Sequence, residues 1–248
     1  MHRFIVFCVF ILLTQCAVLD ARAQDVTTLR LEANRALDRG DYTLAERRAD
    51  EMLKASDDAV VKRAVGDIYL RAGKPKKALE QFEAYLKTAP GQLPFLWQRG
   101  IAQYFVGDFK GGVKQFEVHR TVNPNDVENA AWHFLCLAKA DSFEKAGQMV
   151  LPAPGDRRLP MTEVQQMLSS GDTQSVIDKI EAQTEPANKR EAEFYGYFYL
   201  GLYADAKGNR ETALDWMQKS AKEAPRGYMG DVARVYAKFL AEQQKVNK

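Results

Sequence analysis

The chain has 248 residues, of which 46% are hydrophobic and 27% charged, and this composition excludes a disordered, collagen-like or multi-span membrane protein. Lys and Arg together number 35 and Asp and Glu 33, so the net charge is only +2, and no run of basic residues occurs. Because a nucleic-acid surface requires concentrated positive charge, we do not expect a nucleic-acid partner.

The first 23 residues have the pattern of a secretory signal peptide. A short basic head is followed by an apolar run over residues 4–13, and Ala21-Arg22-Ala23 forms a small-x-small cleavage site. The apolar run is too short to cross a bilayer, since a spanning helix needs about 20 apolar residues, and we expect no transmembrane segment elsewhere. The pattern predicts an exported protein, periplasmic or secreted, whose mature chain begins at Gln24.

A lipid anchor is the alternative to free export. Leu13-Thr14-Gln15-Cys16 resembles the bacterial lipobox, in which the Cys is lipidated and becomes the mature N-terminus. Gln15 departs from that pattern, which favours a small residue before the Cys, so the later cleavage site is the main expectation. Cleavage there removes Cys8 and Cys16 and leaves Cys136 alone, which excludes an intramolecular disulfide in the mature chain.

Glycines that end helix-like segments recur at Gly40, Gly73 and Gly107, with spacings of 33 and 34 residues, and again at Gly208. Seven positions before each Gly stands a small residue: Ala33, Gly66, Gly100 and Gly201. Five positions after it come Ala45, Ala78, Gly112 and Ala213, and nine positions after it Ala49, Phe82, Phe116 and Met217. Pro90, Pro124 and Pro225 each follow one of these glycines by seventeen positions. The repeat unit is therefore about 34 residues long.

This pattern of small residue, turn glycine, alanine, aromatic residue and proline resembles the tetratricopeptide repeat (TPR) family. Small residues let two antiparallel helices approach closely, the Gly accepts a positive φ that ends the first helix, and the Pro stops the second. The resemblance implies an all-α solenoid in which stacked helical hairpins bury one another's apolar faces.

In chain order, the apolar periodicity predicts helical hairpins over residues 26–56, 59–89 and 93–123, then a helix over 127–140 and a short one over 143–150. Three prolines in residues 151–160 predict a linker without regular helix. A weak hairpin over 161–168 and 175–182, a regular one over 187–224 and a capping helix over 227–243 complete the chain. We expect N-terminal repeats over 24–150, the linker over 151–160, and TPR-like repeats with the cap over 161–248.

The candidate binding surface follows from the resemblance, because the first helix of each TPR hairpin faces a concave groove. That register places six polar and aromatic residues there: Arg30, Asn34, Arg63, Arg71, Trp97 and Tyr104. The arginines would pair with carboxylates of a protein or peptide, and the aromatic rings would hold an apolar side chain. The alternative is that Ile101 and Phe105, which share this register, fill the core between repeats and that the arginines are solvated.

A second candidate surface lies in the aromatic segment over residues 194–199. Its members in the groove register are Tyr195, Phe198, Leu202 and Asp205. If they are exposed together, they would form an apolar patch suited to a partner or to a second copy of the chain; the alternative is that they are core.

No motif of a zinc hydrolase, serine esterase, nucleotide-binding loop or dithiol oxidoreductase occurs, so neither catalysis nor a cofactor is expected. Two rival functions remain open. His119, His133 and Cys136 could approach one another on adjacent helices and hold a soft metal ion. The linker near Asp156 and Arg158 could carry a hydrolytic site, because long loops often carry function.

The main hypothesis is an exported, non-catalytic scaffold or adaptor that binds a protein or peptide in its concave groove. The order of regular repeats, weak middle and regular final repeat also resembles, distantly, the TPR lipoproteins of the bacterial envelope. That resemblance implies envelope proteases or cell-wall enzymes as partners.

Overall fold

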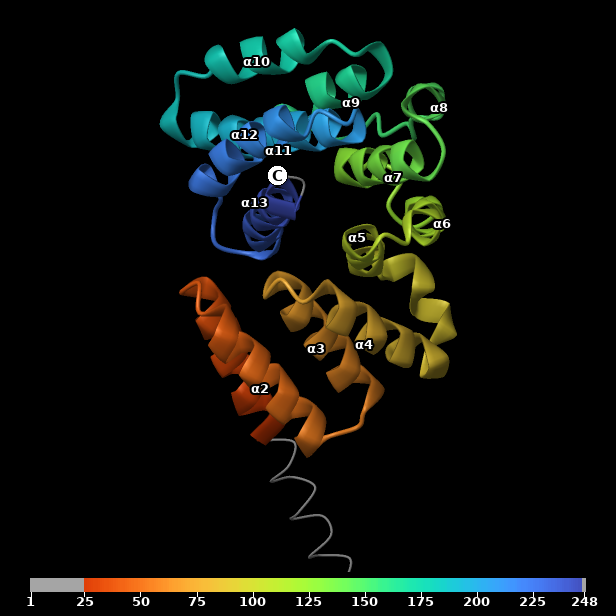
Figure 1. Ribbon diagram of the computed structural model, residues 1–248, viewed down its shortest axis with the longest axis vertical. Coiled ribbons are helices and arrows are strands. Elements are labelled where there is room, and N and C mark those ends of the chain that lie inside the picture. Colours follow the sequence, from red (N-terminus) through yellow and green to blue (C-terminus); the bar gives the residue numbers. More distant parts are fainter. Residues whose placement is uncertain (1–24, 247–248) are drawn as a thin grey trace, which may run out of the picture.

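The computed structural model describes residues 25–246, which form helices joined by short turns and contain no strand within that range. The N-terminal half is a series of antiparallel pairs (Figure 1). A helix over residues 25–38 pairs with α2 (Tyr42–Ala55), α3 (Ala59–Arg71) with α4 (Pro75–Thr88), and α5 (Trp97–Val106) with α6 (Phe109–Arg120); the 3-10 helix η1 (Pro90–Phe95) links α4 to α5. The all-α, TPR-like solenoid predicted from the sequence is thus confirmed. The proposed signal peptide and Cys16 lie outside the described residues.

The second half starts with the weak middle that the sequence predicts. After α7 (Val127–Ala140), α8 (Phe143–Gln148) spans only six residues, and no helix occurs between it and α9. The remaining pairs are α9 (Met161–Ser170) with α10 (Thr173–Glu181) and α11 (Pro186–Ala206) with α12 (Arg210–Glu223), and α13 (Tyr228–Val246) ends the chain. The division into two repeat domains stays a prediction.

The repeat residues bring the helices of the α3–α4 and α5–α6 pairs close together, as expected. Gly107 ends α5 with a φ of 84°, in the left-handed region that favours glycine. A Cβ atom on Gly100 would lie 2.6 Å from the ring of Phe116, and one on Gly66 would lie 2.5 Å from the ring of Phe82. The small residue of the first helix therefore gives the aromatic ring of the second helix the space it occupies.

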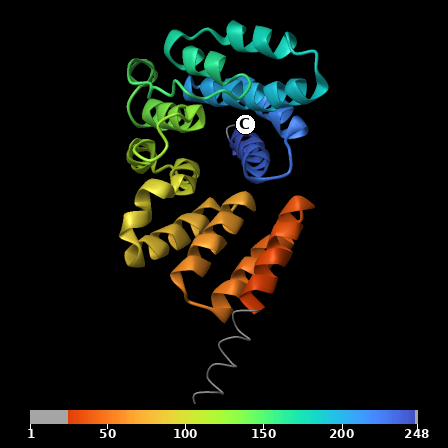
Figure 2. The ribbon, with the colours of Figure 1, turned by 180° about the vertical axis from the view of Figure 1, so that it is seen from behind.

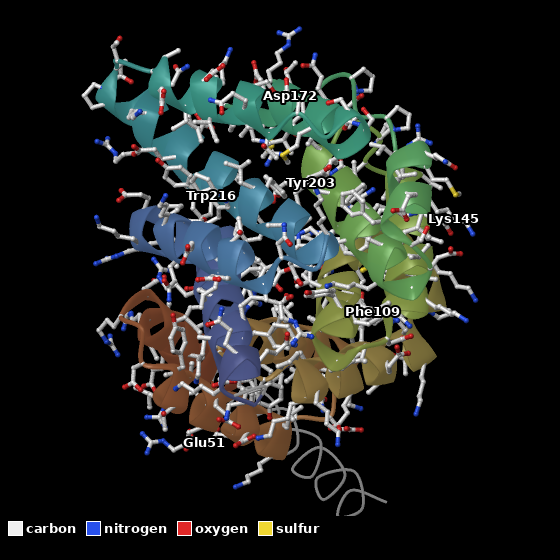
Figure 3. The ribbon with its side chains drawn as sticks, turned by 45° about the horizontal axis from the view of Figure 1, so that its top comes forward. Glu51, Phe109, Lys145, Asp172, Tyr203 and Trp216 are labelled. Carbon is white, nitrogen blue, oxygen red and sulfur yellow. The ribbon has the colours of Figure 1, made fainter. Side chains whose placement is uncertain are left out.

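The final helix does more than cap the end of the stack. It turns back from α12 and runs along the concave side, between the N-terminal hairpins and the α11–α12 pair (Figures 1 and 2). Tyr236 is completely buried, and Val232, Ala233 and Leu240 beside it are buried as well. Charged side chains are spread over the outer surface of the helices (Figure 3). Within residues 25–246, no helix has the length and apolar character required to cross a membrane.

Candidate functional site

The concave face, where the sequence places the binding residues, is largely covered by α13. The rings of Tyr104 and Tyr236 lie 5.5 Å apart between their centroids, and those of Phe105 and Phe239 lie 5.1 Å apart, both in edge-on geometry. Such pairs add to the free energy gained by burying the rings. The final helix therefore occupies, within the molecule, the surface that was expected to receive a partner.

A buried polar network fixes α13 at the centre of this face. The hydroxyl groups of Tyr104 and Tyr236 both donate to the Asp205 carboxylate, the latter over 2.6 Å, and Lys139 Nζ lies 2.8 Å from the other carboxylate oxygen. Burial, followed by the Asp205 charge, raises the pKa of both tyrosines well above its usual value, so both remain donors. The network joins α5, α7, α11 and α13 through one carboxylate.

A second set of polar contacts ties α13 to the N-terminal hairpins. Arg71 donates to Asp231 on α13 over 2.8 Å and to Asn34 over 3.0 Å. The side chains of Arg71 and Asp231 are only 13% and 3% exposed. Burial raises the pKa of Asp231, against the opposing effects of Arg71 and Arg234. This ion pair is therefore desolvated and depends on both partners.

Trp97 also contacts α13. Its ring packs edge-on against Tyr228 with centroids 4.9 Å apart, and the Tyr228 hydroxyl lies 3.4 Å from Asp67. Burial raises the pKa of Asp67 to about 6, although Arg63, the Tyr228 hydrogen bond and Arg71 act to lower it.

Four of the six predicted binding residues, Asn34, Arg71, Trp97 and Tyr104, thus take part in the contacts around α13. The other two do not join them: Arg30 is exposed, and the Arg63 guanidinium stands 5.9 Å from the centre of the Tyr85 ring. The residues of α13 that face the groove were not among the predicted binding residues. Their signal was the spacing of Tyr228, Val232, Tyr236 and Leu240, an apolar stripe longer than a solvent-facing cap requires.

An open cleft of about 430 Å³ remains between α13 and the N-terminal hairpins. Phe105, Val235 and Phe239 provide apolar lining, and Glu46, Lys74, Arg234, Lys238 and Glu242 are its charged residues. Glu46 is already paired with Lys74 over 2.9 Å. The cleft therefore offers an apolar floor and a charged rim on the concave side.

The second candidate surface is core. Phe198 and Leu202 are completely buried and Asp205 is 3% exposed. Tyr195 is half-buried under the Arg158 guanidinium, 5.4 Å from its ring centre. Of the two readings of this segment, the structure agrees with core and not with an exposed patch, because Phe198 and Asp205 lie between α7, α11 and α13.

The His and Cys residues are not brought together as a metal site. His119 Nδ1 lies 2.7 Å from the Pro94 carbonyl oxygen. His133 is buried with Glu117 3.7 Å away, and burial lowers the pKa of its ring. Cys136 packs on Gly112, and burial raises the pKa of its thiol. In residues 25–246, no three His, Cys, Asp or Glu side chains are grouped so that they could hold a metal ion. The metal-binding alternative is therefore withdrawn.

The linker residues form a structural ion cluster. The Arg158 guanidinium binds Asp126 over 2.9 Å, Asp156 over 2.6 Å and also Glu128. Although burial opposes ionisation, the hydrogen bonds from Arg158 lower the pKa of Asp156. Burial raises the pKa of the Glu128 carboxyl, and this effect is larger than the lowering caused by Arg158. The cluster attaches the linker to the start of α7, which accounts for these residues without a hydrolytic role.

No family model matches the chain, and no curated protein matches it. Among solved structures, the chain is similar to a tetratricopeptide repeat protein from Parabacteroides merdae, with 14% identity, 88% of this chain and 99% of that chain covered, and a TM-score of 0.47. It is also similar to the MamA RS-1 ArsTM double mutant (21% identity, coverage 77% and 92%, TM-score 0.34) and to the P58(IPK) TPR domain (16% identity, coverage 91% and 68%, TM-score 0.35).

Proposed function

We propose that this chain is an exported, non-catalytic scaffold that binds a protein or peptide on its concave side, through the cleft beside α13. The observation that carries the proposal is the cleft itself, with about 430 Å³ of space between an apolar floor and a charged rim. Such a surface can take an apolar anchor side chain and pair the charges that flank it. Envelope proteases and cell-wall hydrolases are the partners proposed, in the periplasm or outside the cell.

The contacts of α13 support this location. The inner faces of α3, α5 and α11 already hold a helix by an ion pair, aromatic packing and a carboxylate network, as described above. A repeat surface with these anchors is suited to recognising another chain segment. Because α13 covers Arg71, Trp97 and Tyr104, a partner would reach the concave side through the open cleft beside α13.

The test is affinity capture from envelope extract with the chain that begins at Gln24. In the cleft variant, Val235→Asp places a negative charge on the apolar floor. Lys238→Glu replaces a positive charge on the rim by a negative one, at a side chain that is 77% exposed. The matched control, Val60→Asp/Lys222→Glu, makes the same changes at exposed positions outside the cleft. Thermal melting followed by circular dichroism verifies that both variants fold.

We expect one defined envelope protein to be retained by the parent and the control and lost from the cleft variant. Equal retention by all three chains would place the binding surface elsewhere, and an empty capture by the folded parent would reject the scaffold function. Mass spectrometry of the retained protein would identify the partner.

A further inference from the structure

The cleft beside α13 continues toward the turn that precedes α2. A second hollow of about 230 Å³ opens there, and its lining includes Leu37, Gly40 and Arg226. Tyr42 and Arg234 line both spaces, so the two adjoin along α13 and together form one extended cleft. The apolar floor described above belongs to one end of the extended cleft, and the turn residues belong to the other.

Most of the carboxylates that line the extended cleft are already paired. Glu46 is paired with a lysine over 2.9 Å, and Asp231 is held by two arginines over 2.8 and 3.2 Å. The Glu242 carboxylate lies 3.9 Å from Lys238, and both side chains are exposed. Asp38 is the remaining acidic residue of the lining; it is exposed and makes no ion pair within residues 25–246.

Two arginines of the extended cleft have no such partner. Arg39 and Arg226 are exposed, and neither makes an ion pair or a side-chain hydrogen bond in the part of the chain that the structure describes. Arg39 belongs to the turn before α2 and Arg226 to the connection between α12 and α13, so segments far apart in the sequence bring them to the same hollow. Against the single unpaired carboxylate of Asp38, they leave an excess of positive charge at this end. Guanidinium groups in this state can bind carboxylates through two parallel hydrogen bonds.

Two helix N-termini at the extended cleft strengthen the preference for negative charge. Tyr42 and Thr43, the first two residues of α2, line it, and so does Pro75, the first residue of α4. Lys74, the N-cap residue of α4, makes no capping hydrogen bond with its side chain. Because the N-terminus of a helix carries partial positive charge, both helices favour an anionic group beside them.

We infer that the extended cleft binds an acidic segment of a protein, in which an apolar anchor residue is flanked by two or more Asp or Glu residues. This inference rests on the proposed function and specifies the chemistry of its partner. The anchor lies on the apolar floor beside Phe105 and Phe239, and the flanking carboxylates pair with Arg39 and Arg226. A basic segment would instead place its cations next to two arginines that already lack a counter-ion.

The test is the selection of peptides from a phage-displayed random library. The chain that begins at Gln24 is the parent, and the cleft variant Val235→Asp/Lys238→Glu shows which of the selected peptides need the cleft. The amide analogue of each selected peptide carries Asn and Gln in place of Asp and Glu. Fluorescence anisotropy then gives the dissociation constants of the peptide and of its analogue.

A matched pair of variants isolates the two free arginines. Arg39→Gln/Arg226→Gln removes their charges from the extended cleft. Arg190→Gln/Arg210→Gln makes the same changes at two exposed arginines outside it. All four positions are exposed, and circular dichroism verifies that both variants fold.

We expect the peptides selected by the parent to combine an aromatic or long aliphatic residue with two or more acidic residues. Their amide analogues should bind at least about tenfold more weakly, because charge-assisted hydrogen bonds are lost. The Arg39→Gln/Arg226→Gln chain should show a similar loss for the acidic peptides, and the control pair should bind them within about threefold of the parent. Raising the salt concentration from about 50 mM to about 500 mM should weaken the acidic peptides and leave the analogues nearly unchanged.

Three results would overturn the inference, and they are distinguishable from failure of the scaffold function. If peptides depend on the cleft but their amide analogues bind equally well, the cleft binds peptides without the acidic preference. Equal losses in the two arginine pairs would assign the effect to the overall charge of the chain. If the folded parent selects no peptide, the inference is rejected, while capture from envelope extract still tests the scaffold function by itself.

Discussion

At the scale of single residues, the concave face combines ionisable groups with burial, and Asp67 shows the consequence. Its carboxyl lies close enough to Arg63, Arg71 and Tyr228 for all three to favour its ionised form, yet burial dominates and its pKa rises to about 6. A residue that pairs well in the folded state would have a lowered pKa instead. Asp67 therefore costs stability at neutral pH, although it stands among positive charges.

This leads to a prediction for the pH dependence of stability. Because the folded pKa of about 6 lies above the ordinary value of 3.8, the contribution of Asp67 is most favourable below pH 3.8 and is lost as the pH rises through 6. Replacing it by Asn removes this change. We expect the free energy of unfolding of Asp67→Asn, relative to the parent, to increase by about 1–2 kcal/mol between pH 4 and pH 7, allowing for solvent screening.

Urea unfolding at several pH values measures this difference. The exposed Asp215→Asn on α12 is the control, and its difference from the parent should stay constant within about 0.5 kcal/mol over the same range. If the parent instead gains stability relative to Asp67→Asn as the pH rises, the carboxylate is stabilised by its arginines and burial is not dominant.

At the scale of helices, the spacing of repeat residues translates directly into contacts. Gly100 and Phe116 are sixteen positions apart in the sequence, and in the structure the ring of Phe116 packs on the Gly100 backbone. The same holds for Gly66 and Phe82. Which residues touch within one hairpin is determined by the position of its turn and by the helical period of its two helices. Both can be recognised in the sequence, and this is why the helix boundaries could be predicted closely.

Gly100→Ala tests the close approach of α5 and α6. Alanine is intrinsically better in a helix by about 1 kcal/mol, but its Cβ would meet the completely packed Phe116 ring at 2.6 Å, and overpacking of a core typically costs about 1–3 kcal/mol. We expect the clash to prevail and the free energy of unfolding to fall by about 1–2 kcal/mol. Chemical denaturation gives the value.

Gly91→Ala is the matched control for this substitution. No atom lies within 4 Å of a Cβ placed on Gly91, and its φ is outside the left-handed region, so stability should change by less than about 0.5 kcal/mol. A Gly100→Ala chain as stable as the parent would mean that α5 and α6 separate easily and that the small residue does not determine their distance.

At the scale of the whole molecule, α13 joins segments that are far apart in the sequence. Its contacts include Arg71 with Asp231, 160 positions apart, and Tyr104 with Tyr236, 132 positions apart. No repeat period governs such separations. The sequence thus predicted a terminal helix and the groove residues Arg71, Trp97 and Tyr104, but not that the helix would lie against them.

If α13 connects the N-terminal hairpins to the C-terminal ones, the loss of its contact with α3 should destabilise both α3 and α13. Arg71→Met keeps much of the apolar stem but leaves Asp231, 3% exposed, with Arg234 as its remaining ion-pair partner over 3.2 Å. Because a carboxylate that loses a buried partner is poorly compensated, we expect the free energy of unfolding to fall by about 2–4 kcal/mol. Amide hydrogen exchange should become faster in both α3 and α13.

Arg63→Met separates this effect from the general loss of a positive charge on α3. Arg63 stands over the Tyr85 ring and makes no ion pair to α13 in the described part of the chain, so its replacement should cost less than about 1 kcal/mol and leave exchange in α13 unchanged. Faster exchange confined to α3 in Arg71→Met would show that α13 is held by its other contacts, the Tyr104–Asp205–Tyr236 network and the aromatic packing, without the Arg71–Asp231 pair. Faster exchange in both helices would establish Arg71 and Asp231 as the contact through which the N-terminal hairpins and the final helix stabilise each other.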